Sequence, residues 1–171
     1  FDELSEAASS GNQIPGISTG LPDLDRVTLG LNKSELILVA ARPGMGKTSI
    51  ALNMALTAAM SQHKTVAIFS LEMSREQLVM RLLSRAALIP SQWRDISDAA
   101  QTLSQTDIRI DDNPTLTVSD MNAQCRRVPN LDLVVIDYLQ LMQSAGSGHS
   151  WSNESRTQAV SDISRMLKIM A

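Results

Sequence analysis

A glycine-rich stretch followed directly by lysine and threonine is the part of the sequence whose residue types and spacing point most clearly to chemistry. Gly44 and Gly46 allow a sharp turn, so successive backbone N–H groups can converge on the oxygens of a phosphate. Lys47 would add a full positive charge beside the β- and γ-phosphates of ATP, and the Thr48 hydroxyl would bind Mg²⁺. The predicted nucleotide-binding residues are contiguous: Ala41, Arg42, Pro43, Gly44, Met45, Gly46, Lys47, Thr48 and Ser49.

One position of this loop departs from the usual phosphate-loop pattern, because Ala41 stands where glycine is common. The change is tolerable, since alanine readily adopts backbone angles with negative φ. The alternative interpretation is an ordinary strand-to-helix turn that carries Gly-Lys-Thr by chance. A strand-like run before the loop and a helical pattern after it favour the phosphate loop.

Two carboxylates are expected near this loop. Asp137 ends the apolar run 133–136, which places it at the carboxyl edge of a parallel sheet, where ligands of such folds bind. We expect Asp137 to hold Mg²⁺ through a water molecule. Glu72 follows a predicted strand at 66–70 and is expected at the same edge. With Lys47 it forms the predicted catalytic pair, Glu72 acting as the general base that aligns a water with the γ-phosphate. The alternative for Glu72 is a solvated acid that caps the next helix.

Short apolar runs that alternate with helical patterns must position these side chains. Strands are predicted at 36–41, 66–70, 108–110 and 131–137, and helices at 47–60, 74–85, 118–127 and around 163–170. Strands and helices in this order predict the α/β class, with a mostly parallel sheet covered by helices on both faces. Residues 1–30, rich in Ser, Gly, Asn and Pro, are predicted to be a linker leading into one ATPase domain at 31–171, and 143–153 to be a flexible loop.

Composition narrows the class of protein further. The chain has 171 residues, 43% of them hydrophobic, and a net charge of −3 from 15 basic and 18 acidic side chains, so contact with a polyanion must be local. Its single cysteine, Cys125, excludes an internal disulfide. No apolar run reaches the roughly 18 residues that span a bilayer. We therefore expect a soluble cytoplasmic protein without membrane contact.

Four segments resemble one known family in sequence and in order. They lie at 19–26, 70–74, 137–142 and 163–168, and the Ser-Leu-Glu-Met and Asp-Tyr-Leu-Gln-Leu-Met stretches among them are the specific ones. Together they resemble the C-terminal motor domain of the bacterial and phage replicative DNA helicase, the DnaB family. The resemblance covers nearly the whole chain.

This resemblance implies a RecA-like P-loop NTPase fold with ATP sites between the subunits of a homo-hexameric ring. It also implies translocation on single-stranded DNA, with primase and a helicase loader as further partners, and it assigns the base role to Glu72. By the same resemblance, the family's γ-phosphate-sensing Gln, Arg finger and main DNA-binding loops belong to later segments, beyond Ala171. Residues 1–8 resemble the end of a linker helix that docks on a neighbouring subunit.

Two other functions share part of this pattern. A RecA- or RadA-like recombinase or signalling ATPase has the same approach to the phosphate loop, but it is not expected to carry the Asp-Tyr-Leu-Gln-Leu-Met stretch. A non-catalytic ATP-binding interaction module would keep the loop without turnover. DNA-stimulated ATP hydrolysis separates the helicase from the module, and unwinding as opposed to filament formation separates it from the recombinase.

Overall fold

The computed structural model describes residues 14–86, 93–138 and 153–171. The expectations for residues 1–13 and for the loop at 143–152 lie outside them. The described elements, in chain order, are α2 (Pro22–Thr28), α3 (Lys47–Ser61), β1 (Thr65–Ser70), α4 (Arg75–Ala86), α5 (Trp93–Ser104), β2 (Ile108–Asp111), α6 (Val118–Cys125), β3 (Leu131–Asp137) and α7 (Asn153–Met170).

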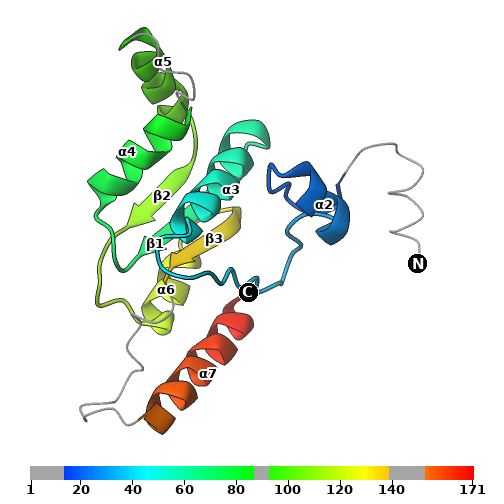
Figure 1. Cartoon of the computed structure of the whole chain (residues 1–171), viewed down its shortest axis with the longest axis vertical. Coiled ribbons are helices and arrows are strands. Elements are labelled where there is room, and N and C mark those ends of the chain that lie inside the picture. The colour runs from blue at the N-terminus through cyan, green and yellow to red at the C-terminus, as the bar shows by residue number, and fades with distance from the viewer. Residues whose placement is uncertain (1–13, 87–92, 139–152) are drawn as a thin grey trace.

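The three strands form one parallel sheet in the order β2, β1, β3. In the central strand, Ile68 is paired with Ile110 on one side and with Val135 on the other. Helices α3 and α4 pack on one face of the sheet, and α6 and α7 lie on the opposite face (Figure 1). The α/β class with a parallel sheet and helices on both faces is therefore confirmed.

Alternation along β1 divides the core into two halves. Val66 and Ile68 are fully buried against α3 and α4, whereas Ala67 and Phe69 are buried against α6 and α7. Consecutive side chains of a strand point to opposite faces, so a strand covered on both sides is apolar at nearly every position. This explains why the short run 66–70 could be recognised in the sequence.

The prediction of a strand at 36–41 is wrong. Within the described residues this segment pairs with no strand, and Ile37, Leu38 and Val39 are 49%, 65% and 46% exposed. The nearest pairing is an isolated antiparallel bridge between Ile17 and Leu31. Apolar side chains favour an extended backbone, but a strand also needs a partner for its N–H and C=O groups. Among the described strands, β3 is paired only with β1.

Other boundaries differ to varying extents. Helix α7 begins at Asn153, about ten residues before the predicted start near 163, so the last predicted helix was placed too short at its N-terminal end. Helix α3 matches the predicted helix at 47–60, and α6 ends at Cys125, two residues before the predicted end. Helix α5 was not predicted, because Trp93–Ser104 contains few large apolar residues and only part of it, including the buried Ala99, faces the core.

Hydrogen bonds hold residues 14–30 against the C-terminal end of α3. The backbone N–H of Ser18 donates to Oε1 of Gln62 at 2.9 Å, and Nε2 of Gln62 donates back to the Ser18 carbonyl at 3.1 Å. Gly20 has φ of +78°, and a Cβ there would lie 2.5 Å from Oγ1 of Thr57, so both the backbone angle and the close approach require glycine. The domain boundary at residue 30 stays a prediction.

Candidate nucleotide-binding site

The predicted phosphate loop forms a tight turn that leads into α3. The Met45 N–H donates to the Arg42 carbonyl at 3.2 Å, and Gly44 and Gly46 have φ of +79° and +85°. A Cβ at Gly44 would meet no atom within 4 Å, so the backbone angle, not the space, requires glycine there. The sharp turn that the two glycines predict is therefore present in the structure.

The first turn of α3 offers backbone hydrogen-bond donors. Gly46 is the N-cap, no side chain of the described residues caps the helix, and no acidic residue lies in its first turn. The first intrahelical bond runs from the Ile50 N–H to the Gly46 carbonyl at 3.0 Å. The N–H groups of the preceding residues, together with the partial positive charge of the helix terminus, form an environment suited to an anion.

Thr48 and Asp137 meet although they lie 89 residues apart in the sequence. Oγ1 of Thr48 donates to Oδ2 of Asp137 at 2.7 Å, and Asp137 is buried, with 8% of its surface exposed. Asp137 is the last residue of β3, and its carboxylate lies beside the N-terminus of α3. A hydroxyl and a carboxylate are the oxygen donors that Mg²⁺ accepts, and Mg²⁺ takes its remaining ligands from water and phosphate. The two predicted metal-binding residues are therefore suitably placed to share one ion.

Glu72 lies in a turn that is tied to the same edge of the sheet. The buried Ser70 hydroxyl donates to the Met73 carbonyl at 2.8 Å and accepts from the Met73 N–H at 3.0 Å. The Leu71 N–H donates to the Asp137 carbonyl at 2.8 Å, which joins the turn to the end of β3. The Glu72 side chain itself is exposed. The structure thus joins the residue before Glu72 to Asp137 and leaves the Glu72 carboxylate accessible to water.

The capping alternative for Glu72 can be compared with the start of α4. The Gln77 N–H donates to the Ser74 hydroxyl at 3.4 Å, and the Ser74 N–H donates to Oε1 of Gln77 at 3.2 Å. The Arg75 N–H donates to Asp112 at 2.8 Å, and this bond holds the pKa of the Asp112 carboxyl below its ordinary value. In the described part of the chain these side chains, and not Glu72, supply the cap. The base role of Glu72 stays a prediction.

Sequence reasoning missed the position of Tyr138. The Nζ atom of Lys47 lies 4.9 Å from the centroid of the Tyr138 ring. In the sequence this tyrosine is only one member of a family-like stretch, since nothing there shows that the residue after Asp137 meets the phosphate-loop lysine. That contact arises only when the end of β3 and the start of α3 are brought together.

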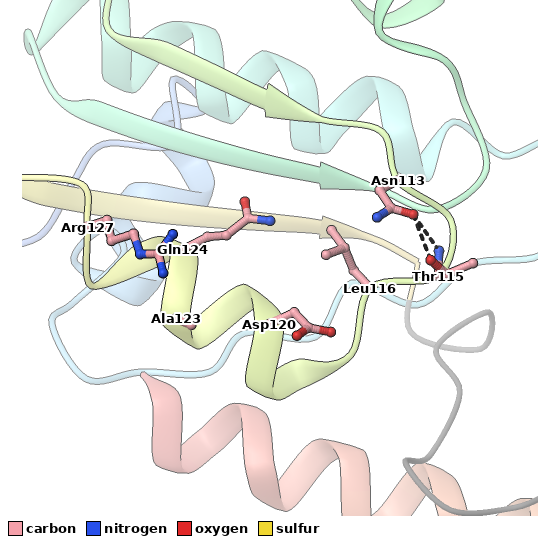
Figure 2. A pocket seen from close by; sticks show the side chains of 7 residues that line it. All are labelled: Asn113, Thr115, Leu116, Asp120, Ala123, Gln124 and Arg127. Atoms are coloured by element: carbon pink, nitrogen blue, oxygen red, sulfur yellow. Dashed lines mark hydrogen bonds between the residues drawn. The ribbon is translucent and has the colours of Figure 1, made fainter.

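A separate cavity of about 410 Å³ lies between α6 and the loop after β2 (Figure 2). Its lining residues are Asn113, Thr115, Leu116, Asp120, Ala123, Gln124 and Arg127. Asn113 accepts hydrogen bonds from the Thr115 N–H and hydroxyl. Asp120 accepts hydrogen bonds from the N–H and hydroxyl of Thr117, the N-cap of α6. None of the predicted nucleotide-binding residues lines this cavity.

Neither a cluster of metal-binding side chains nor a membrane-spanning helix is present in the described part of the chain. The described residues contain no group of three or more His, Cys, Asp or Glu side chains arranged to hold a metal ion. Within the same ranges, no helix is both long and apolar enough to cross a membrane.

Comparison with known proteins agrees with the geometry. Residues 16–171 match the family model described as DnaB-like helicase C terminal domain. The chain belongs to this family. It is 44% identical over 185 residues to replicative DNA helicase DnaB of Geobacillus stearothermophilus, and 44% identical over 185 residues to replicative DNA helicase DnaC of Bacillus subtilis. All of the chain is covered in both comparisons, and it spans 40% of the length of each relative.

Two solved structures resemble the chain in fold. One is described as an ATPase domain, and it superposes with a TM-score of 0.84 and 32% sequence identity, over 99% of this chain and 64% of that one. A DnaB-like replicative helicase, described with its interactions with primase, gives a TM-score of 0.82 and 31% identity over 99% and 43% of the two chains. The expected RecA-like class and the resemblance to the DnaB family are thereby confirmed.

Proposed function

We propose that this chain is the ATP-hydrolysing motor domain of a replicative DNA helicase. The observation that carries the proposal is the hydrogen bond of 2.7 Å between Thr48 and Asp137. It lies at the N-terminus of a helix that follows two glycines with positive φ and that no side chain of the described residues caps. This arrangement supplies phosphate-binding donors, a lysine and two metal-binding oxygens at one edge of the sheet. Family membership supports the helicase as the protein in which the site works.

The proposed reaction is hydrolysis of ATP. Water attacks the γ-phosphorus, the bond from that phosphorus to the bridging oxygen breaks, and ADP and phosphate are released. Glu72 would accept the proton of the water, while Lys47 and the N–H groups of the loop would hold the phosphate oxygens. Mg²⁺, held by Thr48 and through water by Asp137, would supply positive charge to the β- and γ-phosphates.

The proposed assembly is a homo-hexamer that moves along single-stranded DNA and separates the duplex. The chain's net charge of −3 gives no general attraction to DNA, so DNA must be held by local groups facing the path of the strand. Primase and a helicase loader are proposed as further partners. One structural relative supports the primase proposal, because it is described with its interactions with primase.

Unwinding of a forked DNA duplex by the full-length gene product tests this function. We expect ATP-dependent strand separation that is lost in the Lys47→Ala variant and retained in Lys33→Ala, which removes an exposed lysine outside the phosphate loop. Filament formation on DNA without unwinding would instead indicate a recombinase. Nucleotide binding without DNA-stimulated hydrolysis would indicate a non-catalytic module.

A further inference from the structure

Two consecutive residues of α3 contact two consecutive residues at the end of β3. Thr48 donates its hydroxyl hydrogen to Asp137, and the ammonium of Lys47 lies over the ring of Tyr138, 4.9 Å from its centroid. The first pair is accounted for by the proposed metal site. The second pair has no role in the proposed function, although it involves the lysine on which nucleotide binding depends.

The distance between Lys47 and Tyr138 is within the range of a cation–π interaction. The face of an aromatic ring is electronegative, and it attracts a cation within about 6 Å of its centroid. The Tyr138 ring is half-buried, so water screens this attraction less than at a fully exposed site. The ring covers one side of the ammonium, and an ammonium has three N–H donors. Contact with the ring therefore leaves donors available for phosphate oxygens.

Lysine side chains are flexible, and fixing one on binding a ligand costs conformational entropy. A contact that already restricts the side chain in the free protein reduces this cost when the ligand arrives. We propose that Tyr138 is a positioning residue that holds the ammonium of Lys47 at the carboxyl edge of the sheet before the nucleotide binds. The proposal rests on the proposed nucleotide-binding function.

A series of substitutions in the full-length gene product distinguishes the effect of the aromatic ring from the effect of side-chain volume. Tyr138→Phe keeps the aromatic face, Tyr138→Leu removes it, and Tyr138→Met provides a second ring-free side chain if the leucine variant does not fold. Circular dichroism and thermal unfolding establish which variants are folded.

The first measurement needs no nucleotide. The acetylation rate of Lys47 by an N-hydroxysuccinimide ester is followed by mass spectrometry, with the exposed Lys33 as the internal reference. Loss of the ring should expose the amine and raise the Lys47 rate about two- to fivefold relative to Lys33, whereas the phenylalanine variant should match the wild type. Equal rates in the wild type and the ring-free variants would overturn the proposal.

The second measurement is the Kd for ADP and for a non-hydrolysable ATP analogue with Mg²⁺, determined by calorimetry. We expect the ring-free variants to bind about three- to tenfold more weakly and the phenylalanine variant to bind within about twofold of the wild type. In a Lys47→Ala background the same exchange of Tyr138 should change the Kd less than about twofold, because the partner of the ring is gone.

The outcomes of the two measurements distinguish this inference from the function on which it rests. A wild-type protein that binds neither nucleotide would contradict the proposed function, while the acetylation rates would still report the contact. Nucleotide binding that is equally strong with and without the ring would overturn the positioning role alone. A phenylalanine variant that behaves like the leucine variant would also overturn it, because the hydroxyl and not the ring would then be responsible.

Discussion

Lys47 begins α3 at the point where the phosphate loop ends, and its side chain is directed to the end of β3. Lys47→Ala removes the charge that would offset the phosphates, and it should weaken ATP binding at least about tenfold. The fold should be retained, because the lysine is half-buried at the edge of the sheet and belongs to neither apolar cluster. Calorimetry checks the affinity and circular dichroism the fold. Unchanged affinity in a folded variant would contradict the phosphate-loop assignment.

Replacement of Glu72 should slow ATP hydrolysis and leave nucleotide binding intact. Glu72→Gln keeps the size and the hydrogen-bonding capacity of the side chain but removes the proton acceptor, so ATP hydrolysis by the full-length gene product should fall by roughly 10²-fold or more. Phosphate release and equilibrium binding measure the two properties separately. Glu76→Gln, a change of the same kind in the first turn of α4, is the matched control and should leave hydrolysis within about twofold. Hydrolysis within about threefold of the wild type in Glu72→Gln would leave Glu72 without a catalytic role.

The residues of the candidate site differ in how far sequence could predict them. Gly44, Gly46, Lys47 and Thr48 lie within five consecutive positions, and their roles depend on local backbone geometry that the sequence specifies. Asp137 could be added because a residue ending a parallel strand must lie at the carboxyl edge of the sheet. The contact of Tyr138 with Lys47 depends on how a strand end and a helix start meet in space, and sequence spacing carries no signal for that.

At the scale of elements, the buried Asp25 holds the turn that leads into α2. It accepts hydrogen bonds from the Ser18 and Thr19 hydroxyls, both at 2.6 Å, and from the Thr19 N–H at 2.8 Å. Burial alone would raise the pKa of the Asp25 carboxyl. The hydrogen bonds from Ser18, Thr19 and the Gly20 backbone outweigh burial and bring that pKa below its ordinary value of 3.8.

This direction sets the pH dependence of stability. Because the folded protein binds the Asp25 proton less readily than the unfolded chain does, the stabilisation is complete above pH 3.8 and is lost as the pH falls through the lower pKa of the folded state. Asp25→Asn should therefore be less stable at neutral pH, and its deficit relative to the wild type should shrink below about pH 4. Urea unfolding at a series of pH values checks this. A deficit that stays constant down to about pH 2.5 would contradict it.

The exposed residues 37–41 and the buried face of α4 give a second test at this scale. Leu38 is 65% exposed, whereas Leu78 is completely buried between α4 and the sheet. In the 171-residue polypeptide, Leu78→Ala should lower the free energy of unfolding by about 2–5 kcal/mol, and Leu38→Ala by less than about 0.5 kcal/mol. Denaturant unfolding of both variants measures this. A comparable loss in both variants would show that Leu38 is packed in the same way as Leu78.

The apolar runs of the sequence also show which elements of the fold could be predicted. The apolar runs at 66–70 and 131–137 are strands because each finds a paired neighbour, and β1, in the centre, has one on both sides. The run at 36–41 has a similar composition but no partner among the described residues. Composition predicts whether a segment can be buried in a sheet, and pairing decides whether it is.

At the scale of the whole molecule, the candidate site must be considered together with the electrostatic effect of the chain's net charge. The polypeptide carries the phosphate loop, Asp137 and Glu72, which are the groups proposed to bind and activate the nucleotide. Its net charge of −3 provides no general attraction to DNA. By the resemblance to its family, the Arg finger and the main DNA-binding loops belong to segments later than those matched here, and a finger of this kind contributes about 10³ to 10⁵ in rate.

The 171-residue polypeptide on its own should therefore bind Mg-ATP but hydrolyse it barely above background. An Arg finger corresponds to roughly 4–7 kcal/mol of transition-state stabilisation. By the same resemblance the main DNA-binding loops belong to later segments, so single-stranded DNA is not expected to restore hydrolysis. Calorimetric binding and phosphate release, each with and without single-stranded DNA, measure these properties. Strong stimulation by DNA would mean that catalysis and DNA contact reside in residues assigned here to the framework, and the exposed Arg165 of α7 would be the first to replace.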